Sequence, residues 1–134
     1  MMLNPFPTMF LSLFAHAFLR IVLGAILVHL GFRHLTKDRA SLEAAVYQRW
    51  PRFARFAVLY MGVVEIAIGA MFVVGIYTQI AAIVAMALST KMLVFRKYFV
   101  HSALPQSFFY MLMFAVSCSL FITGAGVLAF DLPL

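Results

Sequence analysis

Two residues of opposite charge stand inside long apolar runs of this sequence. Arg20 lies in a run from about residue 10 to residue 32, and Glu65 lies near the centre of a run from about 54 to 74. If these runs cross a bilayer, an ionised side chain at mid-depth costs about 2.5–3.5 kcal/mol on insertion scales. Intramembrane ionisable groups therefore face the protein interior, and they often mark proton relays or ligand sites.

The simplest arrangement that relieves both costs is an ion pair between Arg20 and Glu65, because the two runs are consecutive and antiparallel. His16 precedes Arg20 by one helical turn on the same face. His16, Arg20 and Glu65 are thus the candidate catalytic and cofactor-binding residues, able to bind a polar quinone-like head group or pass a proton. The alternatives are that Glu65 is neutral, that the pair only fixes helix register, and that His16 bonds a backbone carbonyl.

The high content of apolar residues indicates that membrane helices position these side chains. The chain has 134 residues, of which 66% are hydrophobic and 10% are charged, with a mean hydropathy of +1.06. A soluble domain of this length has too little interior for so many apolar residues. We expect an all-α, polytopic membrane protein, a single domain over residues 1–134. Its four transmembrane helices are predicted at about 10–32, 54–74, 79–95 and 108–128.

Small residues should allow these helices to pack closely. Gly62 and Gly69 share a helical face with Glu65, and Gly24 lies one turn from Arg20. A second small-residue face, in the third helix, consists of Ala81, Ala85 and Ser89. Between the first and second runs, residues 41–49 form an amphipathic stretch that we expect to lie along the membrane surface, with Ser41 as its cap. Gly75 and Thr78 offer a glycine stop and a threonine cap for the hairpin that follows.

The distribution of charge predicts the orientation. The loops after the first and third helices contain six and two Lys or Arg residues, and the termini and the middle hairpin contain none. Both basic loops are therefore predicted in the cytoplasm, with both termini outside the cytoplasmic membrane. The basic residues of the membrane loops thus explain the net charge of +6. We expect this charge to face the bilayer surface, and we expect no binding to nucleic acid.

Other cofactor chemistry finds little support in the sequence. His16 and His29 share one helix, but no second span supplies a haem ligand at the depth of His16. The methionines do not form a ligand set, so no metal site is predicted. Cys118, the single cysteine, excludes an intramolecular disulfide and is expected to be a packing residue. No covalently bound cofactor is expected.

Several short motifs, in this order and spacing, resemble the DoxX family of small four-helix membrane proteins. They are Arg20-x-x-x-Gly24 continuing to Leu30-Gly31-Phe32-Arg33-His34, then Glu65-x-x-x-Gly69, Gly75-x-x-Thr78 before Ala81-Ala82, and Gly124-x-Gly126 followed by Asp131. The resemblance marks Gly24, Gly31, Gly69, Thr78 and Asp131 as structural positions, and Gly62 joins them because it shares a helical face with Glu65. The chain departs from the family where His34 replaces a common lysine and Gln79 a common arginine, and the second change leaves at most a hydrogen bond to Asp131.

The resemblance implies association with redox enzymes, as a small subunit of a quinone-linked oxidoreductase such as thiosulfate:quinone oxidoreductase. We therefore expect a membrane subunit that supports quinone-linked redox chemistry, with a protein partner or a second copy of itself and with quinone as a diffusible carrier. Whether the chain is itself part of an enzyme stays open. The alternative, of a different class, is a non-catalytic scaffold or assembly factor for a partner membrane protein, with Arg20 and Glu65 as internal struts.

Overall fold

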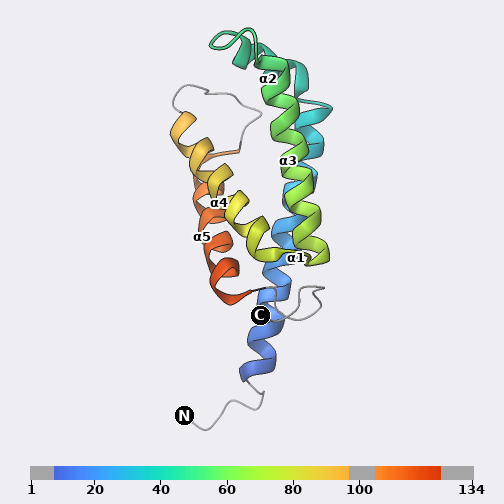
Figure 1. The fold of residues 1–134 in the computed structure, drawn as a ribbon, viewed down its shortest axis with the longest axis vertical. Coiled ribbons are helices and arrows are strands. Elements are labelled where there is room, and N and C mark those ends of the chain that lie inside the picture. Colours follow the sequence, from blue (N-terminus) through green and yellow to red (C-terminus); the bar gives the residue numbers. More distant parts are fainter. Residues whose placement is uncertain (1–7, 97–104, 125–134) are drawn as a thin grey trace.

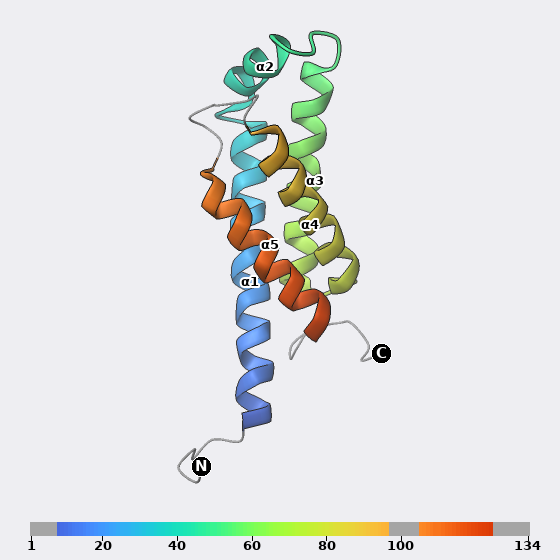
Figure 2. The same ribbon diagram turned by 90° about the vertical axis from the view of Figure 1, so that its left-hand side faces the viewer.

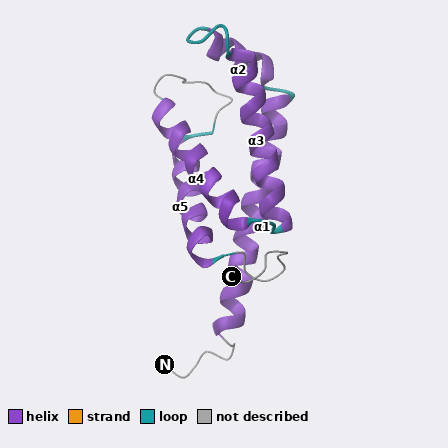
Figure 3. Cartoon of the chain, in the orientation of Figure 1, coloured by secondary structure: helices purple, strands orange, loops and turns teal. Residues whose placement is uncertain are grey.

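The computed structural model describes residues 8–96 and 105–124, and these residues form five α-helices and no strand (Figures 1 and 3). The helices are α1 (Thr8–Leu35), α2 (Arg39–Tyr47), α3 (Ala54–Val74), α4 (Thr78–Phe95) and α5 (Ser107–Thr123). The all-α membrane prediction is confirmed, since α1, α3 and α4 are long and apolar enough to cross a bilayer. α5 is also apolar and has 17 residues, at the short end of the range for a spanning helix.

Local sequence signals set most helix ends. α3 has the predicted bounds, and it ends because Gly75 adopts the left-handed conformation, with φ of 77°. The predicted threonine cap is wrong, since Tyr77 is the N-cap of α4 and Thr78 is its first helical residue. α1 continues three residues past its predicted end. The predicted end of the last helix, at residue 128, lies outside the described residues.

The short helix between α1 and α3 exists, but it begins earlier than predicted. Asp38 is its N-cap, and the Ser41 hydroxyl donates to the Asp38 carbonyl oxygen at 3.0 Å within the first turn. Ser41 is therefore not the cap. α2 lies at one end of the bundle (Figure 2) and buries Leu42.

α1 and α3 pack against each other through glycines along their length. A Cβ on Gly24 would lie 2.6 Å from the Gly69 carbonyl oxygen, and one on Gly31 would lie 2.8 Å from the Gly62 carbonyl oxygen. The two contacts are seven residues apart on each helix, as expected for one antiparallel register. The close approach predicted from these glycines is confirmed.

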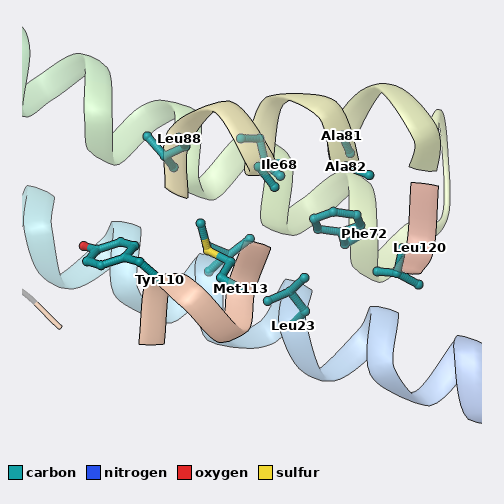
Figure 4. Close-up of a cluster of buried hydrophobic side chains, with 11 residues drawn as sticks. Leu23, Ile68, Phe72, Ala81, Ala82, Leu88, Tyr110, Met113 and Leu120 are labelled. Atoms are coloured by element: carbon teal, nitrogen blue, oxygen red, sulfur yellow. The ribbon is translucent and has the colours of Figure 1, made fainter. Parts of the chain in front are cut away.

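α4 and α5 form a second packed pair. The predicted small-residue face of α4 is buried, with Ala85 and Ser89 at 0% exposure. The core lies between the two pairs of helices, with Tyr110 near one end and Phe72 and Leu120 near the other (Figure 4). Large apolar side chains also cover the outside of the bundle, for example Phe18 and Leu112. An apolar core inside an apolar exterior is what a bilayer solvent allows.

Candidate functional site

The buried polar site of the bundle centres on His34 and Glu65. His34 Nδ1 and Glu65 Oε2 are 2.7 Å apart, and the two side chains are 0% and 1% exposed. α1 supplies the histidine in its last turn, and α3 supplies the glutamate near its middle. At this distance the two groups share a hydrogen bond, which compensates part of the cost of burying both of them.

The predicted ion pair between Arg20 and Glu65 is wrong. The carboxyl of Glu65 bonds His34 through one oxygen, and its other oxygen has no hydrogen-bond partner among the described residues. Arg20 is also fully buried, but its Nη1 donates to the Phe72 carbonyl oxygen at 2.9 Å. Each charged residue is therefore accommodated, as expected inside a membrane, but by a different partner.

Helix register explains why Arg20 and Glu65 do not meet. With Gly24 opposite Gly69, Arg20 is level with the end of α3, while Glu65 is level with about residue 28 of α1. Eight residues of α-helix separate these levels by roughly 12 Å. Side chains lean toward the N-terminus of their own helix, so on antiparallel helices Arg20 and Glu65 lean apart. His34 and Glu65 lean toward each other for the same reason.

Arg20 stabilises the C-terminal end of α3. The last four carbonyl groups of a helix have no partner within it, and α3 ends at Val74, so the Phe72 carbonyl is one of these groups. A cation at this end also interacts favourably with the helix dipole. Met71 O accepts the neighbouring bonds from Gly75 N and Ile76 N. The guanidinium thus has a structural role at the α3–α4 hairpin.

His16 lies further along α1, away from the His34–Glu65 pair. Its Nδ1 is 2.6 Å from the Ser12 carbonyl oxygen, one turn earlier on the same helix. This is the backbone hydrogen bond that the sequence left as an alternative. The structure therefore does not bring His16 and Glu65 together.

Tyr110 of α5 is a further buried polar residue. It is 1% exposed and lies near one end of the core (Figure 4). Within the described ranges the Tyr110 hydroxyl, Glu65 Oε1 and His34 Nε2 form no hydrogen bond with the protein. Three buried polar atoms thus retain donor or acceptor capacity, which buried groups rarely do.

The spacing of residues along α1 could have predicted that His34 is buried. Arg20, Leu27 and His34 recur at intervals of seven, and all three are 0% exposed. A residue two helical turns from another lies on the same face, so extending the stripe from Arg20 predicts that His34 is buried. Because His34 lies next to the basic segment after the first apolar run, the sequence instead indicated a place in or near the loop.

Five of the six residues expected to be structural positions lie within the described residues. Gly24, Gly31, Gly62 and Gly69 all lie at the α1–α3 contact, and Thr78 is fully buried. Asp131 and the motif around Gly126 lie outside the described residues.

Apolar spanning helices around a buried histidine–glutamate pair define a multi-pass membrane protein with an internal polar site. The DoxX family model matches residues 15–102, more than half of the chain. The protein therefore belongs to the DoxX family, as the motifs indicated. No curated protein and no solved structure matches the chain.

Proposed function

We propose that this DoxX-family protein is a membrane subunit that supports quinone-linked redox chemistry by handling a proton at His34 and Glu65. The observation that carries the proposal is the buried 2.7 Å hydrogen bond between these side chains. Ionisable residues within membrane helices commonly serve proton relays or ligand sites. A buried ion pair is a weak source of net stability, which favours a use beyond holding the helices together.

The chemistry of the site suits a quinone head group. Quinone oxygens accept hydrogen bonds, and the Tyr110 hydroxyl can donate one. His34 Nε2 can donate as well when the imidazole carries two protons, or when Nδ1 accepts from a protonated Glu65 carboxyl. Neither atom has a protein partner within the described ranges. A bound quinone would be reduced to a quinol by two electrons from a partner protein and by two protons, one from the His34–Glu65 pair and one from water. His34, Glu65 and Tyr110 would hold and orient it.

The protein's own part is to hold a proton away from water. The imidazole of His34 and the carboxyl of Glu65 can each carry a proton, and the two groups are hydrogen-bonded to each other. Glu65 Oε1 remains available to accept a further proton or hydrogen bond. His16 and Arg20 are not part of this proposed site, because their contacts lie elsewhere on α1 and at the end of α3.

The protein would act in the cytoplasmic membrane together with a protein partner or a second copy of itself. The basic segments, with α2 between α1 and α3, would face the cytoplasm, and both termini would lie outside the cytoplasmic membrane. α5 would be the fourth span, so that residues 1–134 form one membrane domain. A partner protein or a second copy would contact the apolar exterior of the bundle.

A scaffold is the second candidate function. The close glycine contacts between α1 and α3 make a rigid pair of helices, and His34 with Glu65 could serve only to fix their register. Such a protein would hold a partner membrane protein and take no part in proton transfer.

Glu65→Gln separates the two functions, because glutamine keeps the size and a hydrogen-bond acceptor but cannot carry a proton. We expect this variant to assemble normally with its partners while quinone reduction by membranes containing the complex falls at least tenfold. Glu43→Gln is the matched control, since Glu43 is only partly exposed and pairs with Arg39 on α2.

Binding of a short-chain ubiquinone to the purified protein gives a second measurement. We expect binding to the wild type and weaker binding to Glu65→Gln. Full turnover in the variant, together with no quinone binding by the wild type, would reject the redox function and favour the scaffold.

A further inference from the structure

A cavity distinct from the buried polar site lies between α2, α3 and α4. It has a volume of about 310 Å³, at the lower end of the range for small-molecule sites. Its walls are mainly apolar, with Val58 and Met61 from α3, Leu88 and Met92 from α4, and Leu42 from α2. α3 and α4 pack mainly on other helices, α1 and α5 respectively, which leaves this space between them.

The charged residues lining the cavity are all cations. Lys91 and Arg96 lie on its wall, and none of its lining residues is acidic. The three carboxylates in the described ranges, Asp38, Glu43 and Glu65, are each paired with another residue. Lys91 forms no ion pair with any of them, and Arg96 uses one nitrogen to donate to the Pro105 carbonyl oxygen. The cavity therefore carries positive charge that the described protein does not neutralise.

The cavity lies at the end of the bundle where a lipid head group would meet it. α2 and the C-terminal end of α4 are at this end (Figure 2). Trp50 and Tyr60 line the cavity, and aromatic residues of these two types concentrate at membrane interfaces. The Trp50 ring meets the Phe95 ring edge to face, with centroids 6.1 Å apart, so the segment that follows α2 contacts the end of α4.

We propose that this cavity binds one anionic phospholipid. Lys91 and Arg96 receive its phosphate, and an acyl chain lies along Val58, Met61 and Met92. An amphiphile of this kind matches both halves of the cavity, its apolar wall and its unneutralised cations. A zwitterionic phospholipid matches less well, because its head group brings a cation of its own toward Lys91 and Arg96.

Native mass spectrometry of the purified full chain tests the proposal. After delipidation and addition of equal amounts of phosphatidylglycerol and phosphatidylcholine with identical acyl chains, we expect one phosphatidylglycerol to be retained preferentially. Lys91→Gln should weaken this retention about fivefold, from the contribution of one basic residue to anionic-lipid binding. Arg96→Gln should add a similar loss, but Arg96 also bonds Pro105, so Lys91→Gln is the primary variant.

Two controls separate the cavity from general surface charge. Lys37→Gln removes an exposed cation that does not line the cavity, and it should leave retention unchanged. Ala57→Phe fills the cavity without changing charge, and it should lower retention, whereas Ala67→Phe on the exposed face of the same helix should not.

Three results would overturn the proposal. The first is equal retention of the two phospholipids, and the second is an equal loss of phosphatidylglycerol in Lys91→Gln and Lys37→Gln. The third is competition by a short-chain quinone at an equal concentration. If the quinone displaces phosphatidylglycerol from the wild type but not from Ala57→Phe, the cavity is a quinone site. Because His34 and Glu65 do not line the cavity, loss of the redox function in Glu65→Gln leaves the lipid measurement unaffected.

Discussion

At the scale of single residues, the protein buries two cationic or titratable side chains of α1 by different means. Arg20 donates to a helix-terminal carbonyl, and His34 bonds the carboxyl of Glu65. Both arrangements provide hydrogen bonds that lipid cannot supply. The first arrangement belongs to the end of α3, and the second forms the centre of the candidate site.

Arg20→Met should destabilise the protein, because it leaves the buried Phe72 carbonyl without this donor. A buried acceptor that loses its partner costs about 1–3 kcal/mol. Arg33→Met is a suitable control, since Arg33 is exposed and its contact with Asp38 at 3.1 Å should contribute less than about 1 kcal/mol. Thermal unfolding in detergent measures both, and equal melting temperatures for the two variants would contradict the structural role of Arg20.

A double-mutant cycle tests which residue is coupled to Glu65. Glu65→Leu leaves His34 buried without its partner and should cost about 3–5 kcal/mol. Adding His34→Leu should recover much of this loss, so that the two effects are strongly non-additive.

The same cycle with Arg20→Leu provides the contrast. Because Arg20 and Glu65 have separate partners, their effects on the free energy of unfolding should add within about 0.5 kcal/mol. The opposite result would support the Arg20–Glu65 pair predicted from the sequence. In that case the effects of His34→Leu and Glu65→Leu on the free energy of unfolding would add, and those of Arg20→Leu and Glu65→Leu would be strongly coupled.

At the scale of elements, the register of α1 against α3 depends on glycine. The backbone of α1 passes so close to α3 that a side chain at either Gly24 or Gly69 would meet the opposite carbonyl oxygen at 2.6 Å. The nearest obstructing atom at each glycine is a backbone oxygen, which cannot move aside as the end of a flexible side chain could. The glycine contact therefore sets the level at which His34 and Glu65 meet.

Gly69→Val should separate the two helices and cost about 1–3 kcal/mol, the range for overpacking a well-packed interior. Ala70→Val adds a similar side chain to the next position, which is exposed, and should change stability by less than about 0.5 kcal/mol. Unfolding of the two variants in detergent gives the comparison. A tolerated valine at residue 69 would mean that α1 and α3 do not approach this closely.

At the scale of the whole molecule, apolar side chains face outward as well as inward. Ile122 is 75% exposed and Phe108 is 77% exposed, which water would penalise and acyl chains would not. Most cations of the described residues lie between the spanning helices or near the helix ends that border those segments. The molecule is thus arranged for a bilayer with one strongly basic side.

Cysteine labelling tests this orientation. In a Cys118→Ser background, we expect Tyr77→Cys, in the α3–α4 turn, to react with a membrane-impermeant maleimide in intact cells. Gln48→Cys, between α2 and α3, should react only after permeabilisation, because the segments rich in Lys and Arg stay in the cytoplasm. The reverse pattern would invert the topology, and labelling of both sites in intact cells would contradict α3 as a membrane span.

The sequence by itself determined which segments are helices and how closely two of them pack. Apolar runs, Gly75 and the glycines at 24, 31, 62 and 69 act locally or through a repeating face, so their consequences can be predicted without the fold. Only the tertiary structure decided that Glu65 bonds His34 and not Arg20. That choice depends on the register of α1 against α3 and on side chains leaning toward their own helix N-termini, so mid-span positions in two neighbouring helices do not specify a contact.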